Sequence, residues 1–190
     1  RLLNICFSSQ TMADIIGKRF CKDRIRTRPG LLELGPSPIR LTRDGQAHPI
    51  FADFPPNLTL AMTHSGHVDD RRNGHEYERT LPFFRPLATS QLTSNHAVWE
   101  GFGGRVICMQ PHPEIDLVED GQLSRDVEVV MKELLDERSF PGLAEQFGVT
   151  PRMLWHNWRE AAPRSDERRH DSDAHVRANA GSHLLVNTLL

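Results

Sequence analysis

Two short segments of the chain carry the side chains of a nucleophilic site. Cys6 ends an apolar run, and small polar residues follow it at once. His112 ends a second apolar run that begins at Val106, and Glu114 lies two residues further on. A thiolate attacks a carbonyl carbon, an imidazole carries the proton, and a carboxylate orients the imidazole. These residue types predict nucleophilic catalysis if the fold brings the two segments together.

The residues around Cys6 predict a strand, a tight turn and a helix. Residues 2–7 are apolar enough for a short buried strand, and residues 9–17 place Met12, Ile15 and Ile16 on one helical face. Gly17 then suits the end of the helix. A nucleophile in such a turn lies at the C-terminal end of a strand and near a helix N-terminus, where the helix dipole favours a thiolate.

The rest of the first part of the chain predicts further strands and loops. Short strands are expected at 18–26, 31–34, 38–42, 58–63, 87–90, 96–100 and 105–110. The glycines at 101, 103 and 104 predict a hairpin turn between the last two strands. The charged stretch 69–79 is expected to be a surface loop, with Arg71 and Arg72 solvated.

The apolar period changes after Glu114. Helical patterns occupy 123–134, 140–147, 150–161 and the end of 176–190, and residues 163–175 are charged and expected to be flexible. We therefore expect a catalytic α/β part over 1–118 and a C-terminal helical part over 119–190.

Composition indicates the number of domains and the cell compartment of the protein. The chain has 190 residues, 38% hydrophobic and 25% charged, with a formal net charge of −2, which fits one globular domain. Three widely spaced cysteines predict a reducing compartment, and we expect a cytoplasmic protein without a signal peptide or membrane span. The first residues already read as a strand and carry no initial Met, so we expect a fragment whose N-terminal part is missing.

Five segments in order resemble the class I glutamine amidotransferases, in particular the glutaminase part of GMP synthase. The segments are Asn-Ile-Cys-Phe-Ser-Ser-Gln at 4–10, residues 33–42 with 49–51, Thr-His-Ser-Gly-His-Val at 63–68, Ser-Asn-His-Ala at 94–97 and Gln-Pro-His-Pro-Glu at 110–114. The resemblance implies a three-layer, flavodoxin-like α/β fold. Its sheet would be mainly parallel with helices on both faces, and incomplete at the N-terminus.

The same resemblance implies a reaction and its residues. Cys6, His112 and Glu114 would form a Cys–His–Glu triad that hydrolyses the glutamine side-chain amide through a thioester. The substrate-binding residues would be Phe7, through its backbone N–H, with Gln10 and His64. The ammonia would pass to an acceptor on a synthetase domain or subunit, and no cofactor is expected. No metal is expected either, because His64, His67 and His75 have no standard ligand spacing.

The chain departs from the family pattern near the expected pocket. Asn4 and Ser8 replace glycines, Ser9 replaces a histidine, Gly66 replaces an aspartate and Pro111 replaces an aromatic residue. Two alternatives therefore stay open. One is a catalytically degenerate domain that acts as a binding or regulatory module, and the other is a γ-glutamyl hydrolase or peptidase.

A possible helix-turn-helix at 143–159 favours a binding module. Gly148 suits the turn, Thr150 the helix cap, and Trp158 an apolar anchor of the second helix. Nucleic acid is nevertheless an unlikely partner, because the net charge is −2 and no basic patch flanks the segment. The simpler interpretation is a helical hairpin packed on the catalytic part.

Overall fold

The computed structural model describes residues 2–90 and 96–115, together with residues 118–119, 122–123, 129 and 184. Its helices are α1 (Phe7–Phe20), α2 (Arg43–Gln46) and α3 (Gly74–Thr80), with a 3-10 helix η1 (Pro49–Phe51). Its strands are β1 (Leu2–Ile5), β2 (Ile25–Leu41), β3 (Asn57–Asp70), β4 (Arg85–Ser90), β5 (His96–Gly101), β6 (Val106–Met109), β7 (Val118–Glu119) and β8 (Gln122–Leu123).

Six strands form one mixed sheet in the order β1-β6-β5-β4-β2-β3, and β7 and β8 form a separate pair. β1 runs parallel to β6, whereas the other four neighbouring pairs of the sheet are antiparallel. The expected mainly parallel sheet is therefore not what the described strands form. The reason is that β2–β3 and β5–β6 turn back on themselves, and such connections give antiparallel pairs.

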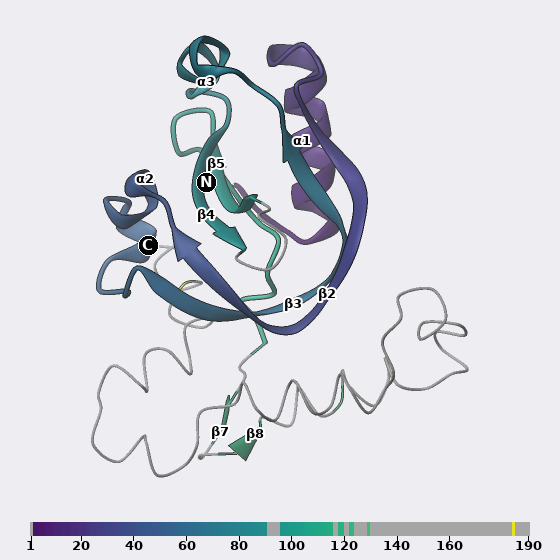
Figure 1. Ribbon diagram of the computed structural model, residues 1–190. Helices are drawn as coiled ribbons and strands as arrows, with labels where there is room; N and C mark the ends of the chain where they lie inside the picture. Colours follow the sequence, from purple (N-terminus) through teal and green to yellow (C-terminus); the bar gives the residue numbers. More distant parts are fainter. Residues whose placement is uncertain are drawn as a thin grey trace.

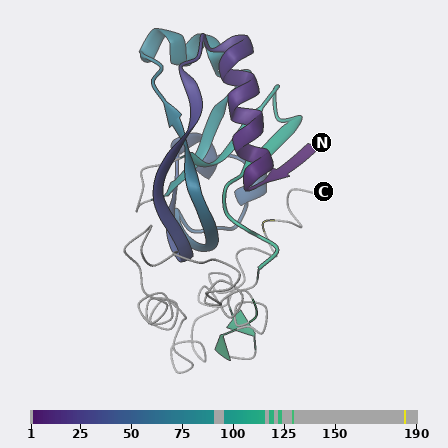
Figure 2. The same ribbon diagram turned by 90° about the vertical axis from the view of Figure 1, so that its right-hand side faces the viewer.

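The sheet is curled into a half-barrel. Figure 1 shows β2 and β3 as two long, curved ribbons that bend round the shorter strands β4 and β5. Figure 2, turned by 90°, shows α1 beside this long hairpin. β1 and β3 are the two edges in the strand order, yet the Cys6 Sγ just after β1 lies 3.9 Å from the Thr63 carbonyl oxygen of β3. The curl therefore brings both edges of the sheet to Cys6.

Each face of the sheet buries an apolar cluster. The cluster on the α1 face holds Ala13, Ile16, Cys21, Ile25, Val68, Phe84, Trp99, Val106 and Cys108. The other cluster includes Ile39, Ile50, Phe51, Leu60, Met62, Leu87, Val98, Ile107, Met109 and Leu184, so η1 covers that face. Successive residues of β6 alternate between the two clusters, as a strand buried on both faces requires. β6 is thus packed on both faces, and this packing fixes the start of the loop that follows it.

Several element boundaries differ from the sequence prediction. α1 continues to Phe20, so residues 18–20 are helical rather than part of a strand. The strands expected at 31–34 and 38–42 belong to one strand, β2. The stretch 69–79 is not a loop throughout, because β3 reaches Asp70 and α3 begins at Gly74 behind an Asn73 capping box.

Arg72 is buried rather than solvated. Its guanidinium donates to both carboxylate oxygens of Asp70 and also to Thr80 Oγ1 and the Phe84 carbonyl oxygen. These bonds hold the pKa of the Asp70 carboxyl well below its usual range, although burial alone would raise it. Arg71, by contrast, is exposed as expected.

The predictions for the C-terminal part fall almost entirely outside the described residues. These include the helical hairpin at 143–159 and the flexible segment at 163–175. Leu123 belongs to β8 rather than to a helix, whereas Val129 and Leu184 are helical. None of the described helices is both long and apolar enough to cross a bilayer.

Candidate active site

Cys6 is the single residue between β1 and α1. Its backbone has φ 50° and ψ −113°, a conformation that costs a non-glycine residue roughly 1–3 kcal/mol. The Cys6 N–H donates to the Met109 carbonyl oxygen (2.7 Å), and the Gln10 N–H donates to the Cys6 carbonyl oxygen (3.2 Å). The parallel strand and the helix therefore both support this turn.

Cys6 is also the accessible cysteine of the chain. Its side chain is half-buried, whereas Cys21 and Cys108 are buried. Burial raises the pKa of the Cys21 thiol and raises that of Cys108 to about 12. Asn4, which replaces a family glycine, lies opposite Cys108 and its Nδ2 is 3.5 Å from the Cys108 sulfur. Asn4 thus packs toward the α1 face without reaching the Cys6 thiol.

His112 is held by backbone and side-chain contacts after the end of β6. Its N–H donates to the Ala61 carbonyl oxygen of β3 (2.8 Å), and its Nδ1 is 2.7 Å from Glu114 Oε1. The ring is oriented by this second contact, which leaves Nε2 as the other titratable nitrogen. Nε2 is buried and makes no hydrogen bond of ordinary geometry within the described part of the chain.

Two neighbouring groups, Cys6 and Glu114, act on the electrostatics of His112. Contact with the Cys6 side chain, followed by the hydrogen bond with Glu114, raises the pKa of His112 to about 9, against the effect of burial. Burial alone would raise the pKa of Glu114, but contact with His112 lowers it below its usual value. The Cys6 thiol and the Glu114 carboxylate therefore both favour the protonated imidazole of His112.

Two further groups lie at the Cys6 sulfur that sequence reasoning did not single out. The Thr63 carbonyl oxygen is 3.9 Å from Sγ, and Gln110 Nε2 is 4.0 Å from it. Gln110 is fully buried, and its Oε1 has no hydrogen-bond partner among the residues described. The register could have indicated Gln110, since Ile5 pairs with Met109 in the parallel ladder and Cys6 therefore faces Gln110.

The residues expected to bind substrate occupy different environments. Phe7 is the first residue of α1, so its N–H has no acceptor within the helix, and its side chain is 76% exposed. Gln10 is buried, and its Nε2 donates to the Gly66 carbonyl oxygen (3.1 Å). A Cβ added at Gly66 would lie only 2.9 Å from Gln10 Oε1, so Gln10 fills the space that a side chain at 66 would need.

The His64 ring is buried within the sheet. Its Nδ1 donates to the Gly66 carbonyl oxygen (2.8 Å), and its Nε2 is 3.4 Å from Glu33 Oε2. The Glu33 carboxylate also accepts from the Ser90 hydroxyl. Burial would raise the pKa of Glu33, but contacts with His64, Ser90 and Ser37 lower it below its usual value. These contacts join β2, β3 and β4 inside the sheet.

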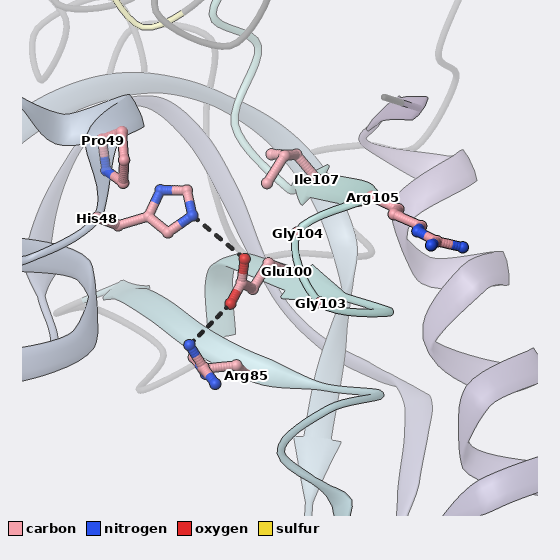
Figure 3. Close-up of a pocket in the computed structure, with 8 residues that line it drawn as sticks. All are labelled: His48, Pro49, Arg85, Glu100, Gly103, Gly104, Arg105 and Ile107. Atoms are coloured by element: carbon pink, nitrogen blue, oxygen red, sulfur yellow. Dashed lines mark hydrogen bonds and ion pairs between the residues drawn. The ribbon is translucent and has the colours of Figure 1, made fainter.

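A cavity of about 530 Å³ lies at the start of β6, at the other end of that strand from His112 (Figure 3). Glu100 forms its floor, with His48 Nε2 3.2 Å from one carboxylate oxygen and an Arg85 nitrogen 3.1 Å from the other. His48 Nδ1 accepts from the Ile50 N–H, so both ring nitrogens are used. Figure 3 shows Arg105 directed away from Glu100. These contacts favour a structural role, fastening η1 to β4 and β5.

Solved structures share this architecture, although sequence comparison alone finds no relative. No family model matches the chain, and no curated protein matches it by sequence. A glutamine amidotransferase from Thermotoga maritima is 18% identical with a TM-score of 0.57, over 98% of this chain and 61% of that one. A glutamine amidotransferase from Methylobacillus flagellatus is 14% identical with a TM-score of 0.57, over 98% and 61%.

The fold is therefore the α/β fold of glutamine amidotransferases, as the sequence resemblance implied. The chain spans about 61% of the length of these structures. At this identity the likeness concerns the fold, and the chemistry has to be argued from the residues of this chain.

Proposed function

We propose that this chain is a glutaminase that hydrolyses the side-chain amide of glutamine and supplies the ammonia to an acceptor. The observation that carries the proposal is the turn at Cys6, which places the accessible one of the three thiols between a strand and a helix N-terminus. Cys6 and Glu114 together raise the pKa of His112 to about 9. The amidotransferase fold supports the same conclusion independently of the site.

The first half of the reaction is attack by Cys6. Its sulfur adds to the side-chain carbonyl carbon of glutamine, the C–N bond breaks, and ammonia leaves with a proton from His112. The product on the protein is a γ-glutamyl thioester. A His112 pKa of about 9 keeps the ring protonated near neutral pH, so it can act as this acid and stabilise a thiolate.

The second half is hydrolysis of the thioester. His112, now neutral, takes a proton from water while the water oxygen attacks the acyl carbon, and the C–S bond then breaks to release glutamate. Glu114 holds the proton on Nδ1, so Nε2 is the nitrogen that exchanges protons with sulfur and water. The N–H of Phe7, free of a helical acceptor, would donate to the oxyanion that forms in both halves.

Substrate binding and ammonia transfer extend the proposal. Gln10 and His64 would shape the glutamine pocket through the Gly66 carbonyl oxygen, which accepts from both side chains. The acceptor would lie on a synthetase domain or subunit, because amidotransfer needs a second substrate beside glutamine. The reaction at Cys6 draws on thiol and imidazole chemistry and calls for no cofactor.

A glutamine-analogue affinity label tests the proposal directly. A diazoketone analogue of glutamine should modify Cys6 stoichiometrically, as seen by mass spectrometry, and excess glutamine should block the reaction. Glutaminase activity should be lost in Cys6→Ala and kept in Cys21→Ser, a matched control at a buried thiol.

Other outcomes of this test point to the alternatives. If Cys6 reacts with a small alkylating reagent but not with the glutamine analogue, the domain is a degenerate binding module. Preferential cleavage of γ-glutamyl peptides over free glutamine would instead identify a γ-glutamyl hydrolase.

A further inference from the structure

The unusual backbone of Cys6 needs support from its neighbours. β1 ends at Ile5 and α1 begins at Phe7, so the chain reverses at one residue with φ 50°. Strained conformations persist only where the surrounding structure determines them. The direction of the Cys6 side chain depends on these angles, so whatever holds the turn also aims the sulfur.

The backbone N–H and C=O of Cys6 are hydrogen-bonded, whereas those of Ile5 point to the edge of β1 opposite β6. The N–H groups of Leu2 and Cys6 donate to Arg105 and Met109 on the side of β6. Because a strand alternates, the N–H and C=O of Ile5 point to the opposite edge. Among the described strands, β1 has β6 as its one neighbour in the sheet. Ile5 therefore has no ladder partner at that edge.

The Ser8 hydroxyl takes both of these groups. Its Oγ accepts from the Ile5 N–H at 2.9 Å and donates to the Ile5 carbonyl oxygen at 2.8 Å. Ser8 is the second residue of α1, so one side chain joins the end of the strand to the first turn of the helix across Cys6. Cys6 itself provides no side-chain cap to that helix. The hydroxyl is thus the side-chain connection that spans the turn.

We propose that Ser8 is a positioning residue for Cys6. Its hydroxyl restricts the turn so that the Cys6 sulfur stays beside His112, Gln110 and the Thr63 carbonyl oxygen. Ser8 replaces a glycine of the family pattern, and in this chain its hydroxyl adds a side-chain connection to the turn. The consequence for turnover rests on the glutaminase proposal, whereas the consequence for thiol reactivity does not.

The test compares Ser8→Ala with Thr11→Ala. Thr11 is also an exposed hydroxyl residue of α1, and its Oγ1 donates to the Phe7 carbonyl oxygen, so it is a matched control. The readouts are the alkylation rate of Cys6 by iodoacetamide across pH 6–9, followed by mass spectrometry, and hydrogen exchange of the Ile5 amide. We expect Ser8→Ala to slow alkylation about tenfold, the effect of one or two lost hydrogen bonds, and to speed Ile5 exchange. Thr11→Ala should stay within about twofold of the wild type.

The pair Ser8→Thr and Ser8→Val repeats the test with equal volumes, in case Ser8→Ala fails to fold. Thr keeps the hydroxyl and should keep the wild-type rate within about threefold, whereas Val should behave like Ala. Equal alkylation rates in the Thr and Val proteins, with unchanged Ile5 exchange, would overturn the inference.

Turnover separates this inference from the proposed function. In an active protein, Ser8→Ala should lower kcat and leave KM nearly unchanged, because the hydroxyl does not contact substrate. If the wild type fails to hydrolyse glutamine, the glutaminase proposal falls, and the alkylation and exchange rates still decide the role of Ser8.

Discussion

Two histidine–glutamate pairs in this molecule have similar chemistry and different surroundings. The side chains of His64 and Glu33 are 2% and 0% exposed, whereas those of His112 and Glu114 are 20% and 47% exposed. In the first pair Nδ1 donates to the Gly66 carbonyl oxygen and Nε2 lies 3.4 Å from Glu33 Oε2, so both nitrogens face oxygen atoms of the sheet. In the second pair Nδ1 binds Glu114, and Nε2 has no hydrogen-bond partner among the described residues.

The difference shows that the pair itself does not make a reactive site. The buried His64–Glu33 pair joins strands of the sheet. Contacts with His64, Ser90 and Ser37 stabilise the Glu33 carboxylate and lower its pKa. A more exposed pair with an unbonded ring nitrogen can exchange a proton, and Cys6 together with Glu114 raises the pKa of His112 to about 9. Access and the third partner therefore distinguish the buried pair from the pair that we propose to be catalytic.

Replacing His112 should give the largest effect on activity. In His112→Asn the acid for ammonia departure and the base for water are both lost, so we expect kcat to fall about 10²–10⁴-fold. Thermal unfolding should change far less, since the N–H bond to Ala61 remains. Steady-state kinetics and a melting curve measure the two quantities. A fall of only a few-fold would place the proton transfer elsewhere.

Replacing His64 should give the reverse pattern. His64→Leu leaves the Glu33 carboxylate buried with fewer partners, and breaking such a contact costs on the order of 3 kcal/mol of unfolding free energy. Urea unfolding at neutral pH measures that cost. In the fraction that stays folded, Cys6 should still react with a small alkylating reagent. A stable protein with an inert Cys6 would make His64 part of the reactive site and remove the contrast.

The hairpin β2–β3, which encloses the site, was the least predictable part of the fold. Pro29, Pro36 and Pro38 lie within β2, although proline lacks the N–H donor of a ladder. They are tolerated because β2 pairs with β4 only over Ile39–Leu41, so most of β2 has one neighbouring strand. The sequence around β2 carries no signal for that long-range arrangement.

Some features of the site depend on residues close in sequence, and others depend on long-range strand pairing. The turn at Cys6 and the His112–Glu114 contact each involve residues close in sequence, and their catalytic roles stay predictions. Gln110 and the Thr63 carbonyl oxygen lie at the sulfur only because of strand register and sheet curl. The roles of Gln10 and His64 in substrate binding stay predictions.

The pH dependence of the unfolding free energy should also distinguish the His112–Glu114 pair from the His64–Glu33 pair. This effect should be smaller than those of the two substitutions above. The folded pKa of His112, about 9, lies above its ordinary value of 6.5, so its contribution is fully present below pH 6.5 and lost as pH rises through 9. After allowing for solvent screening, we expect about 1–2 kcal/mol. Urea unfolding at pH 6 and pH 10 should show the wild type losing its advantage over His112→Asn. Cys6→Ala, which removes the main cause of the shift, should show a narrower window.

Replacing the histidine of a third pair, His48 and Glu100, should give the smallest loss of unfolding free energy. His48 and Glu100 are largely buried, like His64 and Glu33, but Arg85 also pairs with Glu100 and the contact borders a cavity. His48→Gln therefore leaves the carboxylate with a cation, and we expect a loss of only about 1 kcal/mol, the worth of one hydrogen bond. Urea unfolding measures this loss, and Cys6 alkylation should match the wild type because the cavity lies at the far end of β6. A loss as large as that of His64→Leu would mean that Arg85 does not compensate Glu100, and burial alone would then rank the three pairs.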